Sequence, residues 1–310
     1  MTEIEVYILI LIITVIIINS NFSLNLIPKQ DDNLLFIEYL AQFSSKQRNY
    51  RKSVENYQSF GYFVNGEIKD GYGMVTYKFP LIEKKESIFW LKFEPKIFSD
   101  TLSKFGVSRS LFSEISSKGY RTLEGDENLL REQLNKNGFY FKKNGDWGLD
   151  YNYLISISAE INTSIARFLA NELYKSNMDN YVNRVIAALN FVQFIPYGVP
   201  DFVEQYVYFG LALPQESVAI SFSDCDSKST LLAGILKNLI DVQNIILVLC
   251  IFDGVPHMIL GISDLPFKGS SVDYKGKNYL LVETTTPLPL DQHDTFTSSK
   301  YSNLKIIPIS

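Results

Sequence analysis

The stretch SFSDCDSKSTLLAGIL, residues 221–236, joins a polar loop to an apolar repeat of helical spacing. Ser223, Asp224 and Ser227 are residue types that cap the N-terminus of a helix. We therefore expect an amphipathic helix that begins near Cys225, with the sulfur of this cysteine in its first turn. The apolar positions of the repeat are Leu231, Leu232, Ile235, Leu236 and Leu239.

The predicted position of Cys225 changes the chemistry expected of its thiol. A helix N-terminus presents unpaired backbone N–H groups and partial positive charge, and both favour the thiolate. The carboxylates of Asp224 and Asp226 act in the opposite direction. A nearby imidazolium would favour the thiolate again, so Cys225 is a candidate nucleophile that needs a histidine partner.

Elements on both sides of this helix are also predicted. A helix with one apolar face is predicted before it and ends near Pro196. Three strand-like runs follow it at residues 244–252, 257–262 and 279–284, separated by the turn signals Asp253-Gly254 and Lys275-Gly276-Lys277. We expect a helix packed on an antiparallel sheet. The apolar face of the preceding helix consists of Val182, Val185, Ile186, Leu189 and Val192.

The chain has two histidines, and His257 is the candidate base because it lies in a predicted strand, whereas His293 lies in a polar loop. Strand alternation places Glu283 on the same face as Leu281 in the third strand. If this face meets the face of His257, Glu283 can reach the ring and orient the base. A cap of the strand end is the alternative role for Glu283.

An acyl-transfer site also needs donors for the oxyanion of the tetrahedral intermediate. The backbone N–H of Cys225 and the side-chain amide of Gln193 are the candidates, although an amide on a helix also bonds locally. Cys250 lies in an apolar run and is expected to be a core residue, with a disulfide to Cys225 as the alternative.

These motifs resemble the bacterial transglutaminase-like superfamily, which is related to papain-fold cysteine proteases. The resemblance covers roughly residues 180–290, through FVQFIPY, LPQESVAISFSDCDSKSTLLAGILKNL, GVPHMILGI and YLLVETT. It implies that Cys225, His257 and Glu283 form the catalytic triad, and that Gln193 matches the upstream glutamine motif. Asp226 stands where animal-type cross-linking enzymes carry Trp, which favours hydrolysis over glutamine–lysine cross-linking.

Composition and motifs exclude several other function classes. The formal net charge is -5 and no basic stripe is present, so we expect no nucleic-acid partner. Two cysteines and two histidines are too few for a structural zinc site, so we expect no metal. We find no phosphate-binding loop, no dinucleotide fingerprint and no serine nucleophile elbow, and the thiol chemistry requires no cofactor.

The N-terminus carries an apolar run, VYILILIITVIII, at residues 6–18. Its length suits a signal-peptide core, although acidic Glu3 and Glu5 precede it and no clear cleavage site follows. We expect residues 1–28 to be a membrane anchor or signal segment, which would place the catalytic domain outside the cytoplasm. A buried strand or core helix is the alternative.

The predicted organisation therefore has three parts. After residues 1–28, residues 30–150 form an α/β region without a recognisable site, with a helix at residues 34–57 followed by short strands. Residues 151–310 form an α+β papain-like, transglutaminase-like catalytic domain. It would hydrolyse peptide or glutamine amides in a peptide or protein substrate. A catalytically inactive, membrane-tethered binding or assembly module is the alternative, and the oligomeric state is left open.

Overall fold

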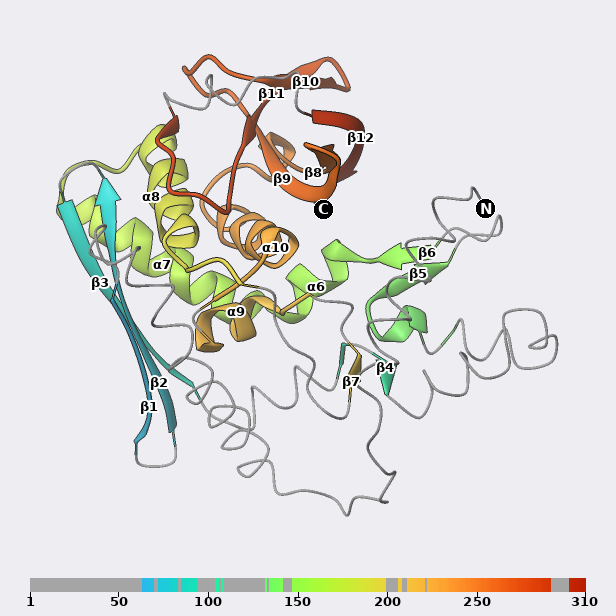
Figure 1. Ribbon diagram of the computed structural model, residues 1–310. Helices are drawn as coiled ribbons and strands as arrows, with labels where there is room; N and C mark the ends of the chain where they lie inside the picture. The colour runs from blue at the N-terminus through green and yellow to red at the C-terminus, as the bar shows by residue number, and fades with distance from the viewer. Residues whose placement is uncertain are drawn as a thin grey trace.

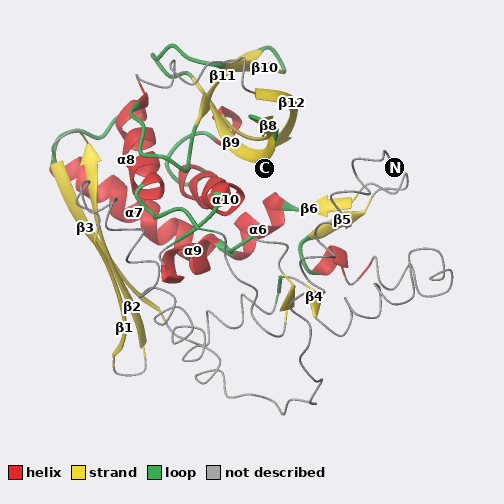
Figure 2. Cartoon of the chain, in the orientation of Figure 1, coloured by secondary structure: helices red, strands yellow, loops and turns green. Residues whose placement is uncertain are grey.

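The computed structural model describes residues 63–69, 72–82, 85–93, 104–105, 107–108, 132, 134–141, 147–198, 206–207, 211–220, 222–290 and 301–310. The apolar run at residues 6–18, the predicted helix at residues 34–57 and His293 lie outside these ranges. Within them the fold combines helices with antiparallel sheets, so the α+β class is confirmed (Figures 1 and 2).

The largest sheet is curled and antiparallel, with strand order β10-β11-β9-β8-β12 (Figure 1). Its hairpins turn at Asp253-Gly254 and Lys275-Gly276, and all four residues have positive φ, as two-residue hairpin turns require. The three predicted strands are confirmed as β8, β9 and β11, whereas β10 and β12 had not been predicted. The strands are β8 (Ile245–Phe252), β9 (Val255–Ser263), β10 (Ser271–Tyr274), β11 (Lys277–Val282) and β12 (Tyr301–Pro308).

Helix α10 (Cys225–Leu236) lies between the curled sheet and two further helices, α7 (Ala159–Lys175) and α8 (Tyr181–Gln193) (Figure 1). The sequence predicted α8 and α10 but not α7. Helix α10 was expected to be amphipathic, yet every residue from Ser227 to Leu236 is buried, because protein covers it on all sides. The remaining short helices are α6 (Tyr151–Ile157), α9 (Pro214–Ile220) and the 3-10 helix η2 (Val242–Asn244).

A glycine permits the close contact between α10 and α7. A Cβ atom at Gly234 would lie 2.2 Å from Nδ2 of Asn162, well inside van der Waals contact. The buried Asn162 donates to the backbone oxygen of Ile155, so it cannot easily move aside. Gly234 therefore fixes the depth at which the Cys225 helix packs.

A three-stranded antiparallel sheet, in the order β1-β2-β3, covers α7 and α8 on the side away from α10 (Figure 1). Its Tyr77 and Phe89 pack against Phe191 of α8, with ring centroids 5.4 and 5.5 Å apart. One cluster of buried residues therefore runs from this sheet to the curled sheet. The N-terminal strands are β1 (Phe63–Lys69), β2 (Tyr72–Ile82), β3 (Lys85–Phe93), β4 (Val107–Ser108), β5 (Phe139–Phe141) and β6 (Trp147–Leu149), and β7 (Tyr206–Val207) pairs with β4.

In the parts of the chain described above, every helix is too short or too polar to cross a membrane. The N-terminal segment predicted at residues 1–28 lies outside those parts.

Candidate active site

Cys225 is the first residue of α10, as predicted. The N-cap is Asp224, whose extended backbone ends the preceding loop and whose carboxylate accepts a hydrogen bond from Ser227 N at 3.3 Å. Asp226 accepts from the same N–H at 2.9 Å. The two carboxylates therefore lie close together on either side of Cys225 in the chain.

Burial raises the pKa of the Cys225 thiol to about 12, and the neighbouring Asp226, Asp224 and Glu283 carboxylates add to this effect. The backbone N–H of Met258 opposes the shift by donating to the sulfur. The acidic neighbours act in the direction predicted from the sequence, whereas burial, the largest cause, had not been predicted. The thiol is therefore neutral at physiological pH.

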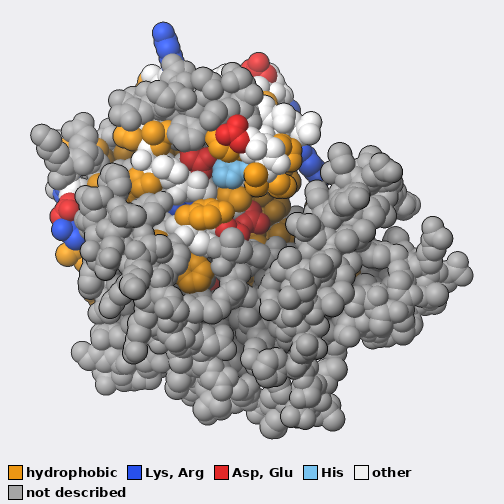
Figure 3. All heavy atoms as spheres, viewed as in Figure 1, with side chains coloured by type: hydrophobic (Ala, Val, Ile, Leu, Met, Phe, Trp, Pro, Cys, Tyr) orange, Lys and Arg blue, Asp and Glu red, His pale blue; other side chains and the backbone are white. Residues whose placement is uncertain are grey.

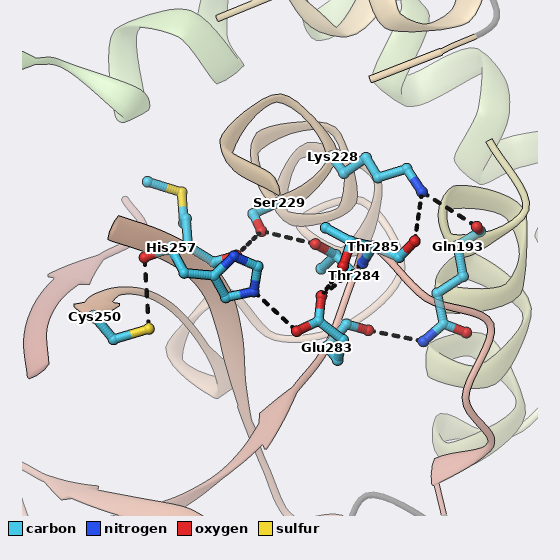
Figure 4. Close-up of polar contacts among 9 residues, drawn as sticks. Gln193, Lys228, Ser229, Cys250, His257, Glu283, Thr284 and Thr285 are labelled. Atoms are coloured by element: carbon cyan, nitrogen blue, oxygen red, sulfur yellow. Dashed lines mark hydrogen bonds and ion pairs between the residues drawn. The ribbon is translucent and has the colours of Figure 1, made fainter. Parts of the chain in front are cut away.

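His257 pairs with the buried Glu283, with 2.9 Å between His257 Nε2 and Glu283 Oε2 (Figure 4). The other carboxylate oxygen accepts from the backbone N–H of Thr285 at 2.7 Å and from its hydroxyl at 2.6 Å. Burial disfavours the charged carboxylate, but the hydrogen bond and charge of the protonated His257 ring, together with the two Thr285 donors, outweigh it and lower the pKa of Glu283 to about 2. Because an ionised carboxylate only accepts, Nε2 carries a proton, and Nδ1 is therefore the nitrogen that can accept one.

The strand register explains this pairing. In the β9–β11 ladder Gly261 faces Leu281 and Leu260 faces Val282, so Glu283 follows one step beyond the last pair. That step brings it opposite Ile259, which lies on the same face of β9 as His257. The two predicted faces do coincide, and Glu283 reaches the ring.

The Cys225 sulfur contacts the backbone of Met258, which follows His257 in β9. Among the hydrogen bonds of the described residues, none joins Cys225 to the His257 ring, and the sulfur instead faces the N–H that follows His257 in β9. The His257 side chain is 15% exposed. On the face seen in Figure 3, a histidine reaches the surface between acidic and apolar side chains, so the ring is open to solvent on one side.

The side-chain amide of Gln193, the predicted oxyanion donor, makes hydrogen bonds within the protein. Its Nε2 donates to the backbone oxygen of Glu283 at 2.7 Å and to that of Leu288 at 3.3 Å, while its Oε1 accepts from Leu288 N at 3.3 Å (Figure 4). An amide has only two N–H groups, so neither remains for a substrate. Gln193 instead anchors the chain around Glu283 to the end of α8.

Two residues that the sequence analysis missed lie beside the predicted triad. Lys228 is fully buried and its Nζ donates to the backbone oxygens of Gln193 and Thr285 at 3.2 and 3.3 Å. Ser229 contacts the Met258 oxygen and the Thr284 hydroxyl, both at 3.1 Å (Figure 4). A lysine next to a helical run that is otherwise uncharged was the signal that could have revealed this site.

Cys250 lies across the β8–β9 ladder from His257 and is buried, with its sulfur 3.5 Å from the His257 backbone oxygen. Both cysteines are free, so the alternative of a Cys225–Cys250 disulfide is wrong and Cys250 is a core residue.

No cluster of three or more His, Cys, Asp or Glu side chains in the described ranges could hold a metal ion. Comparison with known proteins adds no relative: no family model matches the chain, and neither a curated protein nor a solved structure matches it.

Proposed function

We propose that the chain is a transglutaminase-like thiol hydrolase with a papain-like core, which cleaves peptide or glutamine amides through Cys225, His257 and Glu283. The observation that carries this proposal is the His257–Glu283 pair, 2.9 Å apart, beside the helix that begins at Cys225. Peptides or proteins are the proposed substrates, and the thiol chemistry needs no cofactor.

In the proposed reaction the Cys225 sulfur attacks the amide carbonyl while Nδ1 of His257 takes the thiol proton. Because the thiol is neutral beforehand, proton transfer accompanies the attack and no ion pair forms in advance. Glu283 stabilises the resulting imidazolium, which then protonates the leaving amine. Water releases the acyl group from the thioester.

The amide of Gln193 already donates to two backbone oxygens, so we look to another group for the oxyanion donor. The backbone N–H of Cys225 lies at the first helical position, where N–H groups have no acceptor within the helix. We assign this N–H to the oxyanion. Hydrolysis is favoured over cross-linking because it needs only water, whereas cross-linking needs a site that excludes water and admits a lysine.

We also propose that the N-terminal apolar run, residues 6–18, anchors or exports the protein, with the catalytic domain outside the cytoplasm. The second candidate function is a membrane-tethered binding or assembly module without turnover. The raised pKa of Cys225, about 12, is the observation that favours it, because a scaffold needs no reactive thiol.

Acylation by p-nitrophenyl acetate tests the choice between these two functions without a known substrate. We expect release of p-nitrophenol and one acetyl group on Cys225, located by mass spectrometry after digestion. His257→Ala should slow this acylation by on the order of 10²-fold or more, since general-base catalysis contributes that much.

Cys250→Ser is the matched control, because it removes the other thiol and leaves the triad intact. It should acylate at the wild-type rate. Acylation that does not require His257, or none at Cys225, would favour the binding module.

A further inference from the structure

The buried ammonium of Lys228 links the elements that carry the triad. Lys228 lies one helical turn after Cys225 in α10 and has no exposed surface. Its Nζ donates to the backbone oxygen of Gln193, at the end of α8, and to that of Thr285, after β11. One side chain thus ties the nucleophile helix to two other segments (Figure 4).

Both hydrogen bonds lead to Glu283. Through Gln193, the connection continues from the side-chain amide to the Glu283 backbone oxygen at 2.7 Å. Through Thr285, it continues from the backbone N–H and hydroxyl to the Glu283 carboxylate at 2.7 and 2.6 Å. The position of the carboxylate beside His257 therefore depends on where Lys228 holds these two neighbours.

A lysine is an unfavourable choice for this position on stability grounds alone. Burial lowers the pKa of Lys228 to about 7, although Glu283 and Asp224 partly offset that effect. Well-packed apolar side chains often replace buried charges with no loss of stability. Methionine has a similar shape but no N–H group, so it could not donate to the two backbone oxygens that Lys228 contacts.

We propose that Lys228 is the positioning residue of the thiol site, which holds Gln193 and Thr285 so that Glu283 stays against the His257 ring. The catalytic part of this inference rests on the proposed function, whereas the geometric part does not. Lys228 touches no reacting atom and acts through Glu283.

The test compares Lys228→Met with Thr230→Val in the full chain. Thr230 is a buried residue of the same helix whose hydroxyl donates only within α10, to the Asp226 oxygen at 2.7 Å. The geometric readout is the His257 Nε2–H proton in NMR, assigned by its loss in His257→Gln. The catalytic readout is the acylation rate with p-nitrophenyl acetate, and thermal unfolding reports on the fold.

We expect Lys228→Met to lose the exchange-protected ring proton and to acylate at least tenfold more slowly, without a lower melting temperature. Thr230→Val should keep the ring proton and stay within twofold of the wild-type rate. A Lys228→Met protein that keeps both the ring proton and the rate would overturn the inference. If the wild type itself shows no acylation of Cys225, the proposed function fails, but the ring proton still decides the role of Lys228.

Lys228→Gln serves if Lys228→Met does not fold. Glutamine is polar but one bond shorter, and the carbonyl oxygens already lie 3.2 and 3.3 Å from Nζ. It should therefore lose the ring proton in the same way, and its retention would count against the proposal.

Discussion

The carboxylate of Glu283 is shared between two partners: Oε2 lies 2.9 Å from Nε2 of His257, and Oε1 accepts both donors of Thr285. Every oxygen of this buried group is therefore engaged. Such an arrangement holds both the charge and the orientation of the carboxylate, and it sets the tautomer of the ring.

Glu283→Gln keeps the shape of the side chain but removes its charge. We expect the acylation rate of Cys225 to fall on the order of 10²-fold, because the imidazolium formed during attack loses its stabilising partner. Rates with p-nitrophenyl acetate measure this effect. Thr285→Ser, which keeps both donors, is the control, and an unchanged rate in Glu283→Gln would mean that Glu283 only caps the strand.

The same carboxylate makes stability depend on pH. Folding lowers the pKa of Glu283 from 4.5 to about 2, so its contribution to stability is fully present above pH 4.5 and is lost as the pH falls toward 2. Urea unfolding between pH 6 and pH 2.5 should therefore show a decline in the free energy of unfolding that is shallower in Glu283→Gln. Parallel declines in the two proteins would contradict this account.

Asp226→Asn should make Cys225 more reactive. The Asp226 carboxylate raises the pKa of the thiol, and each pKa unit removed increases the thiolate fraction tenfold while the thiol remains mostly neutral. Iodoacetamide alkylation from pH 7 to 10, in a Cys250→Ser background, should rise with pH and be several-fold faster in Asp226→Asn. A slower reaction in the variant would show that Asp226 assists the thiol.

Gln193→Leu separates an anchoring role from an oxyanion role. We expect a loss of about 1–3 kcal/mol in the free energy of unfolding, because the hydrogen bonds from the Gln193 amide to the backbone oxygens of Glu283 and Leu288 are removed. Asn190→Leu is the control, since the one hydrogen bond of the Asn190 side chain within the described ranges is long, 3.4 Å from Nδ2 to the Leu81 oxygen. Unchanged stability with a rate lowered by about 10²–10³ would instead support the oxyanion role.

The sequence predicted the elements whose signals are local. Helix α8 follows from its apolar periodicity and strands β8 and β9 follow from their short apolar runs, and the turn at Asp253-Gly254 sets the register between the two strands. The turn signal at Lys275-Gly276 separates the next two strands, so the sequence alone allowed the contact between His257 and Glu283 to be predicted.

Other features depend on segments far apart in the chain. The edge strand β12 pairs with β8 across a long connection, and its register shifts between Ser302 and Lys305, so alternation is a poor guide to it. The direction of the Gln193 amide depends on where Leu288 returns to α8.

Helix α7 was missed although it repeats apolar residues at a spacing of four, at Ile161, Ile165, Leu169 and Leu173.

The neutral state of Cys225 has a consequence for how long the site survives. The thiolate is the form that attacks peroxides and disulfide reagents, so a thiol with a pKa of about 12 is converted to sulfenic acid or a mixed disulfide only slowly. A nucleophile activated only while its substrate is bound would persist in surroundings that inactivate a permanently ionised cysteine.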